Sequence, residues 1–212
     1  LTWNYADFDP GVYHLEAVAQ GGGLAPEAVV AETVITVDAH ITGTVSGAGS
    51  APLSDTTLRF SVEGDEIDAA MTDAVGSFTL RAPPDTAGQL SFEREVTDAD
   101  RNEIGVSDAL DALRLAVGLE PSWGPADAAD FLAADFNADG SVGVSDALDI
   151  LRTAVGLDTE SQPRWVFGDI ENDIVDANSV PVLNNELDIA ALSADTQINV
   201  QAILVGNMEN YV

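Results

Sequence analysis

Residues 134–157 read ADFNADGSVGVSDALDILRTAVGL and carry the most regular pattern in the chain. Counted from Asp135, side chains with oxygen atoms stand at positions 1, 3, 5 and 12, and a glycine stands at position 6. Alternate oxygen ligands, a sharp turn at a glycine and a late carboxylate are typical of a twelve-residue calcium loop, in which position 7 adds a backbone carbonyl. The stretch therefore predicts a calcium site whose ligands are Asp135, Asn137, Asp139, Ser141 and Asp146.

An amphipathic helix should follow this loop, because its apolar residues recur at spacings of four, three and four. This stripe consists of Val144, Leu148, Leu151 and Val155. Ser145 can cap the start of the helix and Gly156 its end. Asp146 closes the loop where an EF-hand has Glu, so the final ligand is shorter.

The pattern of loop and helix occurs twice. Residues 105–119 read GVSDALDALRLAVGL and residues 143–157 read GVSDALDILRTAVGL, so the copies differ only at Ala112/Ile150 and Leu115/Thr153. This tandem pair resembles the dockerin domain, a calcium-dependent module that binds cohesins, over about residues 96–157. The resemblance implies an all-α unit, one or two calcium ions and a cohesin-like partner. It also implies recognition by positions 10 and 11 of each loop, which are Val106, Ser107, Val144 and Ser145.

The first copy departs from the loop pattern. Counting back twelve residues from Asp108 puts Thr97, Ala99 and Arg101 at ligand positions, and this register breaks the site. A loop one residue shorter restores the alternation with Asp98, Asp100, Asn102, a backbone carbonyl near Ile104, and Asp108. Two alternatives stand for this loop: a second calcium site, or a degenerate loop that keeps its shape by hydrogen bonds alone.

The composition limits the classes of partner. The chain has 212 residues, 46% of them hydrophobic, and a formal net charge of -30 from 37 acidic and 7 basic residues. Such a charge repels phosphate backbones and anionic lipids, so we expect neither nucleic-acid binding nor membrane binding. There is no cysteine, which excludes disulfides, thiol catalysis and thiolate metal sites.

Alternating apolar residues predict β-strands on both sides of the repeats. Residues 1–39 read as three strands, and residues 9–19 (DPGVYHLEAVA) resemble the next-to-last strand of bacterial immunoglobulin-like or cadherin-like repeats. Four more strands are expected, and their turns and apolar positions resemble the carboxypeptidase-regulatory-like (transthyretin-like) β-sandwich of secreted proteins. These four strands cover residues 41–45, 57–62, 68–71 and 77–82. Strands after residue 163 lack a hydrophobic partner of their own, so we expect them to return to this sheet.

We therefore expect a mainly β fold with an all-α insertion. The predicted domains are a partial immunoglobulin-like segment (1–39), an immunoglobulin-like or transthyretin-like β-sandwich (40–95 with 163–212), and a dockerin-like calcium-binding insertion (96–160). A short helix within residues 125–134 should connect the repeats. Residues 168–173 and 206–211 are either further ion sites or ordinary polar turns, and the last stretch resembles the tails of large bacterial surface proteins and adhesins.

Nothing in the sequence indicates catalysis, so we predict a protein that is not an enzyme. His14 and His40 lie in or beside predicted strands without a partner motif, and no glycine loop has the residues needed to bind phosphate. A calcium loop of this class is filled outside cells and largely empty in cytosol, which predicts an extracellular or cell-surface location. The chain begins within a predicted strand, so we expect it to be a piece of a longer secreted protein.

The predicted function is that calcium rigidifies the dockerin-like unit and thereby fixes how neighbouring domains of an extracellular adhesion protein are joined. Three alternatives remain open. The helix faces bind a cohesin-like domain or another copy of the chain; neighbouring copies complete the N-terminal strands and build a surface fibre; or the chain is an accessory domain of a secreted polysaccharide-degrading enzyme.

Overall fold

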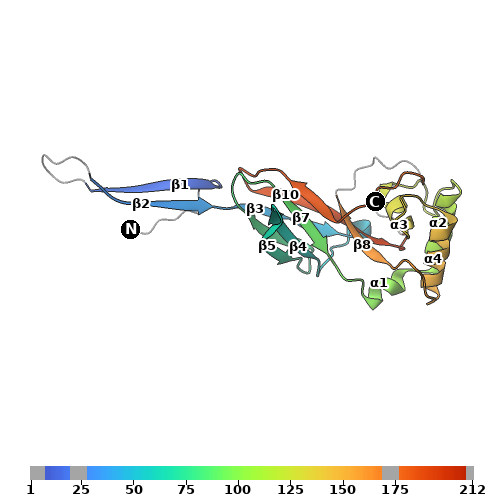
Figure 1. The fold of residues 1–212 in the computed structure, drawn as a ribbon. Coiled ribbons are helices and arrows are strands. Elements are labelled where there is room, and N and C mark those ends of the chain that lie inside the picture. Colours follow the sequence, from blue (N-terminus) through green and yellow to red (C-terminus); the bar gives the residue numbers. More distant parts are fainter. Residues whose placement is uncertain (1–7, 20–27, 169–176, 209–212) are drawn as a thin grey trace.

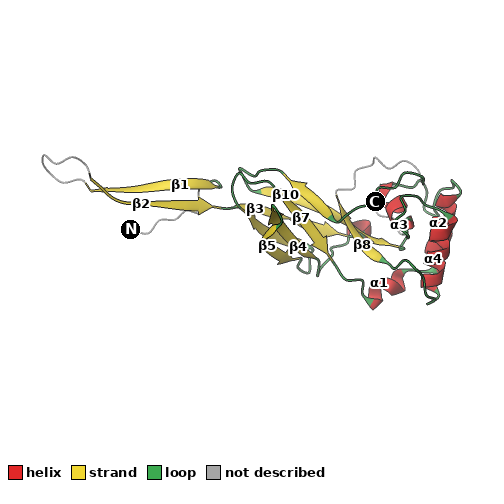
Figure 2. Cartoon of the chain, in the orientation of Figure 1, coloured by secondary structure: helices red, strands yellow, loops and turns green. Residues whose placement is uncertain are grey.

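The computed structural model describes residues 8–19, 28–168 and 177–208. Within these residues the protein is mainly β, as predicted, with one two-stranded sheet, two four-stranded sheets and four short α-helices. Figures 1 and 2 show these parts in a row, with the two-stranded sheet at one end and the helices at the other. No described helix has the length and apolar character needed to cross a membrane.

The two-stranded sheet is an antiparallel ribbon of β1 (Gly11–Ala19) and β2 (Ala28–Val37). Among the described strands, these two pair only with each other, and the ribbon extends away from the rest of the chain (Figure 1). Tyr13 lies opposite Ile35 on the more apolar face, and His14 lies opposite Val34 on the other. The third strand expected near the N-terminus falls in residues 1–7, outside the described part.

The two four-stranded sheets form the body of the protein, which we call the two-sheet body. Their strand orders are β6-β3-β10-β8 and β5-β4-β7-β9. The strands are β3 (Ala39–Ser46), β4 (Thr57–Val62), β5 (Asp65–Met71), β6 (Ser77–Ala82), β7 (Gly88–Glu93), β8 (Arg164–Gly168), β9 (Glu186–Ile189) and β10 (Thr196–Val205), and a short 3-10 turn, η1 (Ala48–Ser50), follows β3. The prediction that the C-terminal strands return to the sheet of the earlier ones is confirmed, since β10 pairs parallel to β3 and antiparallel to β8.

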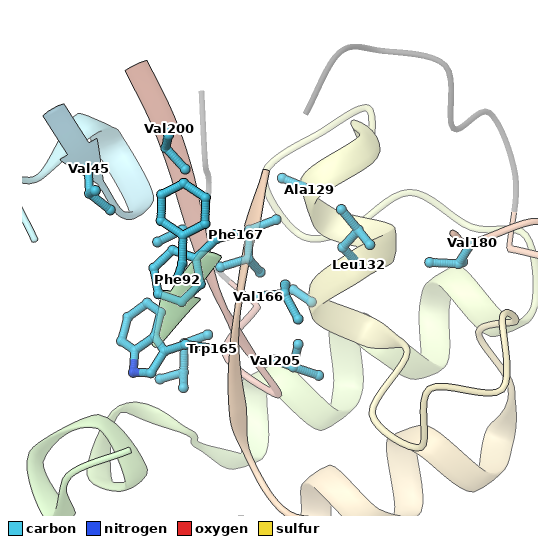
Figure 3. Close-up of a cluster of buried hydrophobic side chains, with 14 of the residues drawn as sticks. Val45, Phe92, Ala129, Leu132, Trp165, Val166, Phe167, Val180, Val200 and Val205 are labelled. Carbon is cyan, nitrogen blue, oxygen red and sulfur yellow. The ribbon is translucent and has the colours of Figure 1, made fainter. Parts of the chain in front are cut away.

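Side-chain alternation explains why these segments pack as sheets. In β6, Phe78, Leu80 and Ala82 are buried, whereas Thr79 and Arg81 between them are exposed. Phe92 of β7 stacks on Phe167 of β8 with ring centroids 5.5 Å apart, so the two sheets share one core (Figure 3).

Strand β8 is buried on both of its faces. Phe167 points toward Phe92, whereas Val166 points the other way, toward Leu132 of a helix (Figure 3). A strand covered on both sides reads as a continuous apolar run, as Trp165, Val166 and Phe167 do. The core of the two-sheet body therefore continues into the helices.

The helices all lie between β7 and β8 in the chain, and we call them the helical unit. They are α1 (Asp98–Glu103), α2 (Val106–Ala116), α3 (Ala128–Ala134) and α4 (Val144–Ala154). The helix predicted after the second loop is confirmed as α4, and the connecting helix as α3, which begins late because Asp127 caps it. Helices α2 and α4, the two copies of the repeat, pack side by side (Figure 1).

The helix ends follow the repeat. Gly156 ends α4 with φ of 72°, and the N–H of Leu157 donates to the Arg152 carbonyl at 2.8 Å, which is the Schellman pattern. The expected cap at Ser145 is wrong, because Ser145 lies inside α4. Gly143 holds the cap position instead, and its N–H donates to the Asp146 carboxylate at 2.9 Å.

Candidate calcium site

The ends of the predicted calcium loop, residues 135–146, are held by two buried carboxylates. Asp135 ends α3, and its carboxylate accepts hydrogen bonds from the N–H groups of Asp139 (3.2 Å) and Gly140 (3.1 Å). Asp146 lies in the first turn of α4 and accepts from the N–H groups of Asn137 (3.0 Å) and Gly143 (2.9 Å). The loop backbone therefore closes around these two side chains.

The remaining predicted ligands lie on the open side of the loop. The Asp139 carboxylate is exposed and accepts from the Asn137 amide (3.0 Å) and the Ser141 hydroxyl (2.6 Å). The Asn137 side-chain oxygen accepts from the Asp139 N–H at 2.8 Å. All five predicted ligands are thus within one hydrogen-bonded loop, which turns at Gly140 with φ of 84°.

The charge of the loop favours a cation. Burial raises the pKa of the Asp135 carboxyl, and the nearby charges of Asp146 and Asp139 raise it further, while N–H donors oppose the rise. In contrast, hydrogen bonds from Ser141 and Asn137 lower the pKa of Asp139. Carboxylate, amide and carbonyl oxygens are the donors that Ca²⁺ takes, so the chemistry of this set fits that ion.

The carboxylates are nevertheless not gathered into a closed cage. Within the described ranges, no three His, Cys, Asp or Glu side chains come close enough to hold a metal ion between them. The predicted ligand set includes three such side chains, Asp135, Asp139 and Asp146, so calcium binding would require them to move closer together around the ion. Calcium binding by this loop therefore stays a prediction.

The first repeat does not form the alternating loop. Residues Asp98–Glu103 form α1, in which Thr97 and Asp100 make a capping box: the Asp100 carboxylate accepts from the Thr97 N–H (2.7 Å) and hydroxyl (2.8 Å). Successive helix residues point 100° apart, so alternate positions cannot surround one point. Asp98 and Asn102 are exposed.

The last two members of that set are also placed differently. The Ile104 side chain is buried, and the Asp108 carboxylate accepts from the Gly105 N–H at 2.5 Å. The structure thus does not bring Asp98, Asp100, Asn102, Ile104 and Asp108 together. It favours the alternative in which this loop keeps its shape by hydrogen bonds.

Sequence reasoning missed a residue behind the second loop. The guanidinium of Arg164, the first residue of β8, donates to the backbone carbonyls of Phe136 (2.7 Å) and Asp135 (2.9 Å). Burial lowers the pKa of Arg164, whereas the charges of Asp135 and Asp146 raise it. The only signal in the sequence was an arginine, one of seven basic residues, directly before an apolar strand.

A second contact that the sequence did not indicate comes from residues 177–180. The N–H of Val142 donates to the Ala177 carbonyl at 2.6 Å, and the N–H of Val180 donates to the Gly140 carbonyl at 2.9 Å. These bonds tie the middle of the loop to the chain that follows β8. The possible ion site at residues 168–173 falls almost entirely outside the described residues, and in the tail only Gly206, Asn207 and Met208 are described.

The apolar stripe of each repeat faces outward. Val144 is 62% exposed and Leu148 is 48% exposed, and their counterparts Val106 and Leu110 in α2 are each 57% exposed. Between the two helices lies a groove of about 440 Å³. It is lined by Val106, Ser107, Ala109, Leu110, Leu113, Val144, Ala147, Leu148 and Leu151. Of the predicted recognition residues, Val106, Ser107 and Val144 line this groove, and Ser145 is exposed outside its lining.

Comparison with known proteins does not place the chain in a family. No protein-family model and no curated protein sequence matches it. A solved structure titled "The Bacillus anthracis TIE protein" aligns over 93% of this chain and 27% of that chain, with 10% sequence identity and a TM-score of 0.32. The chain thus spans about a quarter of that protein's length, and a similarity this low supports no argument about function.

Proposed function

We propose that this chain is an extracellular, non-enzymatic calcium-binding module of a surface or adhesion protein. In this proposal the loop of residues 135–146 binds one calcium ion, which stiffens the helical unit and fixes it against the two-sheet body. The observation that carries the proposal is the pair of buried carboxylates, Asp135 and Asp146, which the loop backbone orients from opposite ends. Two buried like charges are costly, and the single positive charge of Arg164 offsets only part of that cost, so a cation is favoured here.

The fold family is part of the same proposal. The two sheets would be an immunoglobulin-like or transthyretin-like β-sandwich, and the helical unit a dockerin-like insertion between β7 and β8. The element order and the packing of the two repeat helices against each other support this assignment. The absence of an alternating loop in the first repeat limits the proposed calcium content to one ion.

Each predicted ligand has a distinct task. The carboxylates of Asp135, Asp139 and Asp146, the Asn137 amide oxygen and the Ser141 carbonyl would hold the ion. Calcium supplies the positive charge that offsets the repulsion among the carboxylates. The chain supplies orientation, since backbone N–H groups already fix the Asp135 and Asp146 side chains. At free calcium about a thousand times Kd, one ion stabilises the folded chain by roughly 4 kcal/mol.

The test is a calcium titration by calorimetry, with thermal unfolding in calcium and in chelator. Asp139→Ala is the informative variant, because Asp139 is exposed and its loss leaves the Asp135 and Asp146 contacts in place. It should weaken calcium binding at least tenfold, whereas the matched control Asp98→Ala in the first repeat should not. An unfolding temperature that is the same in calcium and in chelator would contradict the proposal.

A second candidate function is protein docking through the exposed apolar faces of α2 and α4. Ten large apolar side chains of the repeats are 37–62% exposed, which is an unusual cluster for a surface without a partner. They are Val106, Leu110, Leu113, Val117, Leu119, Val144, Leu148, Leu151, Val155 and Leu157.

The proposed occupant is a folded domain with an apolar, cohesin-like face and a neutral or basic rim. The groove lining carries no charged residue, while each chain as a whole carries a net charge of -30. A second copy would bring the same large negative charge, which opposes association. Light scattering at 0.15 M and 1 M salt distinguishes a different partner from a second copy of the chain. A chain that is monomeric at both salt concentrations supports a different partner. A dimer that becomes more stable at the higher salt concentration would identify a second copy as the occupant.

A further inference from the structure

Arg164 reaches the candidate calcium loop from another part of the fold. It opens β8, which pairs with β10 in the two-sheet body, yet its guanidinium donates to the carbonyls of Asp135 and Phe136 at the start of the loop. These contacts join residues 28 and 29 positions apart in the sequence. Arg164 is therefore a direct link between the sheet and the loop.

The orientation of these contacts leaves the loop carboxylates available. The guanidinium binds main-chain carbonyls, and the Asp135 and Asp146 carboxylates instead accept from loop N–H groups. The positive charge of the Arg164 guanidinium thus lies behind the loop. It does not occupy the carboxylate oxygens of Asp135 and Asp146 that a cation would use. Its charge acts on both carboxylates and would also repel a bound cation.

The loop does not depend on Arg164 alone for its shape. Val142 and Gly140 are bonded to residues 177–180, and the Ala133 carbonyl before the loop accepts from the Gly206 N–H at 2.8 Å. Loss of the two Arg164 hydrogen bonds therefore leaves the loop anchored at its middle and close to its start. The main consequence of removing the arginine for ion binding is then the loss of its charge.

We propose that Arg164 is an internal counter-charge of the calcium loop: it stabilises the loop when calcium is absent and lowers the affinity of the loop for calcium. The inference rests on the proposed calcium function and deepens it. In this inference Arg164, a residue of β8, sets the free calcium concentration at which the helical unit stiffens. The charge of Arg164 would keep the loop folded when calcium is scarce. It would also let bound calcium exchange readily with calcium in solution.

Two variants separate the charge of Arg164 from its hydrogen bonds. Arg164→Gln removes the charge, and we expect calcium affinity to rise about tenfold and the unfolding temperature in chelator to fall. Arg164→Lys keeps the charge but loses the fork of two donors, so calcium affinity should stay within threefold of wild type while the unfolding temperature in chelator falls. Calorimetric titration with CaCl₂ measures the affinity and scanning calorimetry in EGTA measures the stability.

The matched control is Arg152→Gln. Arg152 lies in the same helical unit and pairs with Asp149 at 3.6 Å on the surface, so its removal changes the net charge equally without touching the loop. At 0.15 M salt, screening over about 8 Å should leave calcium affinity in this variant unchanged. A rise in affinity in Arg152→Gln equal to that in Arg164→Gln would overturn the proposal.

The outcomes also separate this inference from the proposed function. Calcium binding by Arg164→Gln alone, and not by wild type, would refute the proposed function and support the counter-charge. Binding by wild type with no gain in Arg164→Gln would refute the counter-charge only, and binding by neither would refute both. If Arg164→Gln does not fold, Arg164→Lys still decides, because a change in its calcium affinity of more than about threefold contradicts a role through charge.

Discussion

Asp127 and Asp130 cap α3 by reciprocal hydrogen bonds. The N–H of Asp127 donates to the Asp130 carboxylate at 2.8 Å, and the N–H of Asp130 donates to the Asp127 carboxylate at 3.1 Å. Asp130 is 2% exposed, so its carboxylate is almost fully removed from water. Burial raises the pKa of Asp130 to about 6; the charges of Asp127 and Asp111 add to the rise, and hydrogen bonds from the backbone and Trp123 oppose it.

This pKa predicts a pH dependence of stability. The folded state holds the Asp130 proton more tightly than the unfolded state, so its contribution is fully present below about pH 4 and is lost as pH rises through about 6. Asp130→Asn should therefore be more stable than wild type at pH 7.5, by at most about 3 kcal/mol, and equally stable near pH 4. Urea unfolding between pH 4 and 8 measures this. The control is Asp158→Asn, because Asp158 is an exposed acid. An Asp130→Asn variant that is less stable than wild type at pH 7.5 would contradict the prediction.

Replacing Gly140 by alanine should damage the loop. Its φ of 84° is a left-handed conformation that costs a residue with a side chain about 1–2 kcal/mol. An added Cβ would also lie 3.3 Å from the Val180 carbonyl oxygen. We expect Gly140→Ala to lower the free energy of unfolding by about that amount and to weaken calcium binding. Gly47→Ala is the control, because its site is open and its φ is -92°.

Gly43 should tolerate no side chain at all. A Cβ there would lie 1.7 Å from the carbonyl oxygen of Ile198, where β3 and β10 pair. Because the two nearest atoms, the carbonyl oxygen and carbon of Ile198, belong to the backbone, the strands themselves would have to separate. We expect Gly43→Ala to cost about 4 kcal/mol or more in the free energy of unfolding, measured by urea titration. A loss below about 1 kcal/mol would mean that the β3–β10 pairing is not as close as described.

The apolar stripe and the buried side of α4 should respond differently to mutation. Leu148 is half exposed, so Leu148→Ser should change the free energy of unfolding by no more than about 0.5 kcal/mol. Ile150 is fully buried, so Ile150→Ala should cost about 2–5 kcal/mol. If the stripe docks a partner, Leu148→Ser and Leu110→Ser should each abolish capture of that partner while the chain stays folded. A large stability loss in either serine variant would show that the stripe is covered within the fold.

Local patterns in the sequence predicted much of this structure. The repeat at residues 143–157 predicted α4 and its end at Gly156, because apolar spacing and a terminal glycine are local properties. Alternation predicted β3, β4, β5 and β6 to within a few residues. Strand β7 (Gly88–Glu93) was missed, since its apolar residues Leu90 and Phe92 form too short a run to stand out.

The candidate site was less predictable for two reasons. In the first repeat, residues 98–103 form the helix α1 instead of a calcium loop. The Asp100 carboxylate caps the start of this helix together with Thr97, so it is not available as a loop ligand. Arg164 and residues 177–180 reach the second loop through tertiary contacts across 28 residues or more, which no local pattern encodes. Periodicity likewise defined the stripe of α4 but not whether it faces the core or solvent.

The parallel pairing of β3 and β10 has a mechanical consequence. The register from Ile41 with Thr196 to Ser46 with Gln201 runs both strands in the same direction. A pull on the N-terminal end of β3 against the C-terminal end of β10 would therefore load all the hydrogen bonds between them at once, in shear, rather than opening them one by one. The two-sheet body has the geometry of a tension-bearing link, and the loop of residues 135–146 lies beside the end of β10, where such a force would leave the fold.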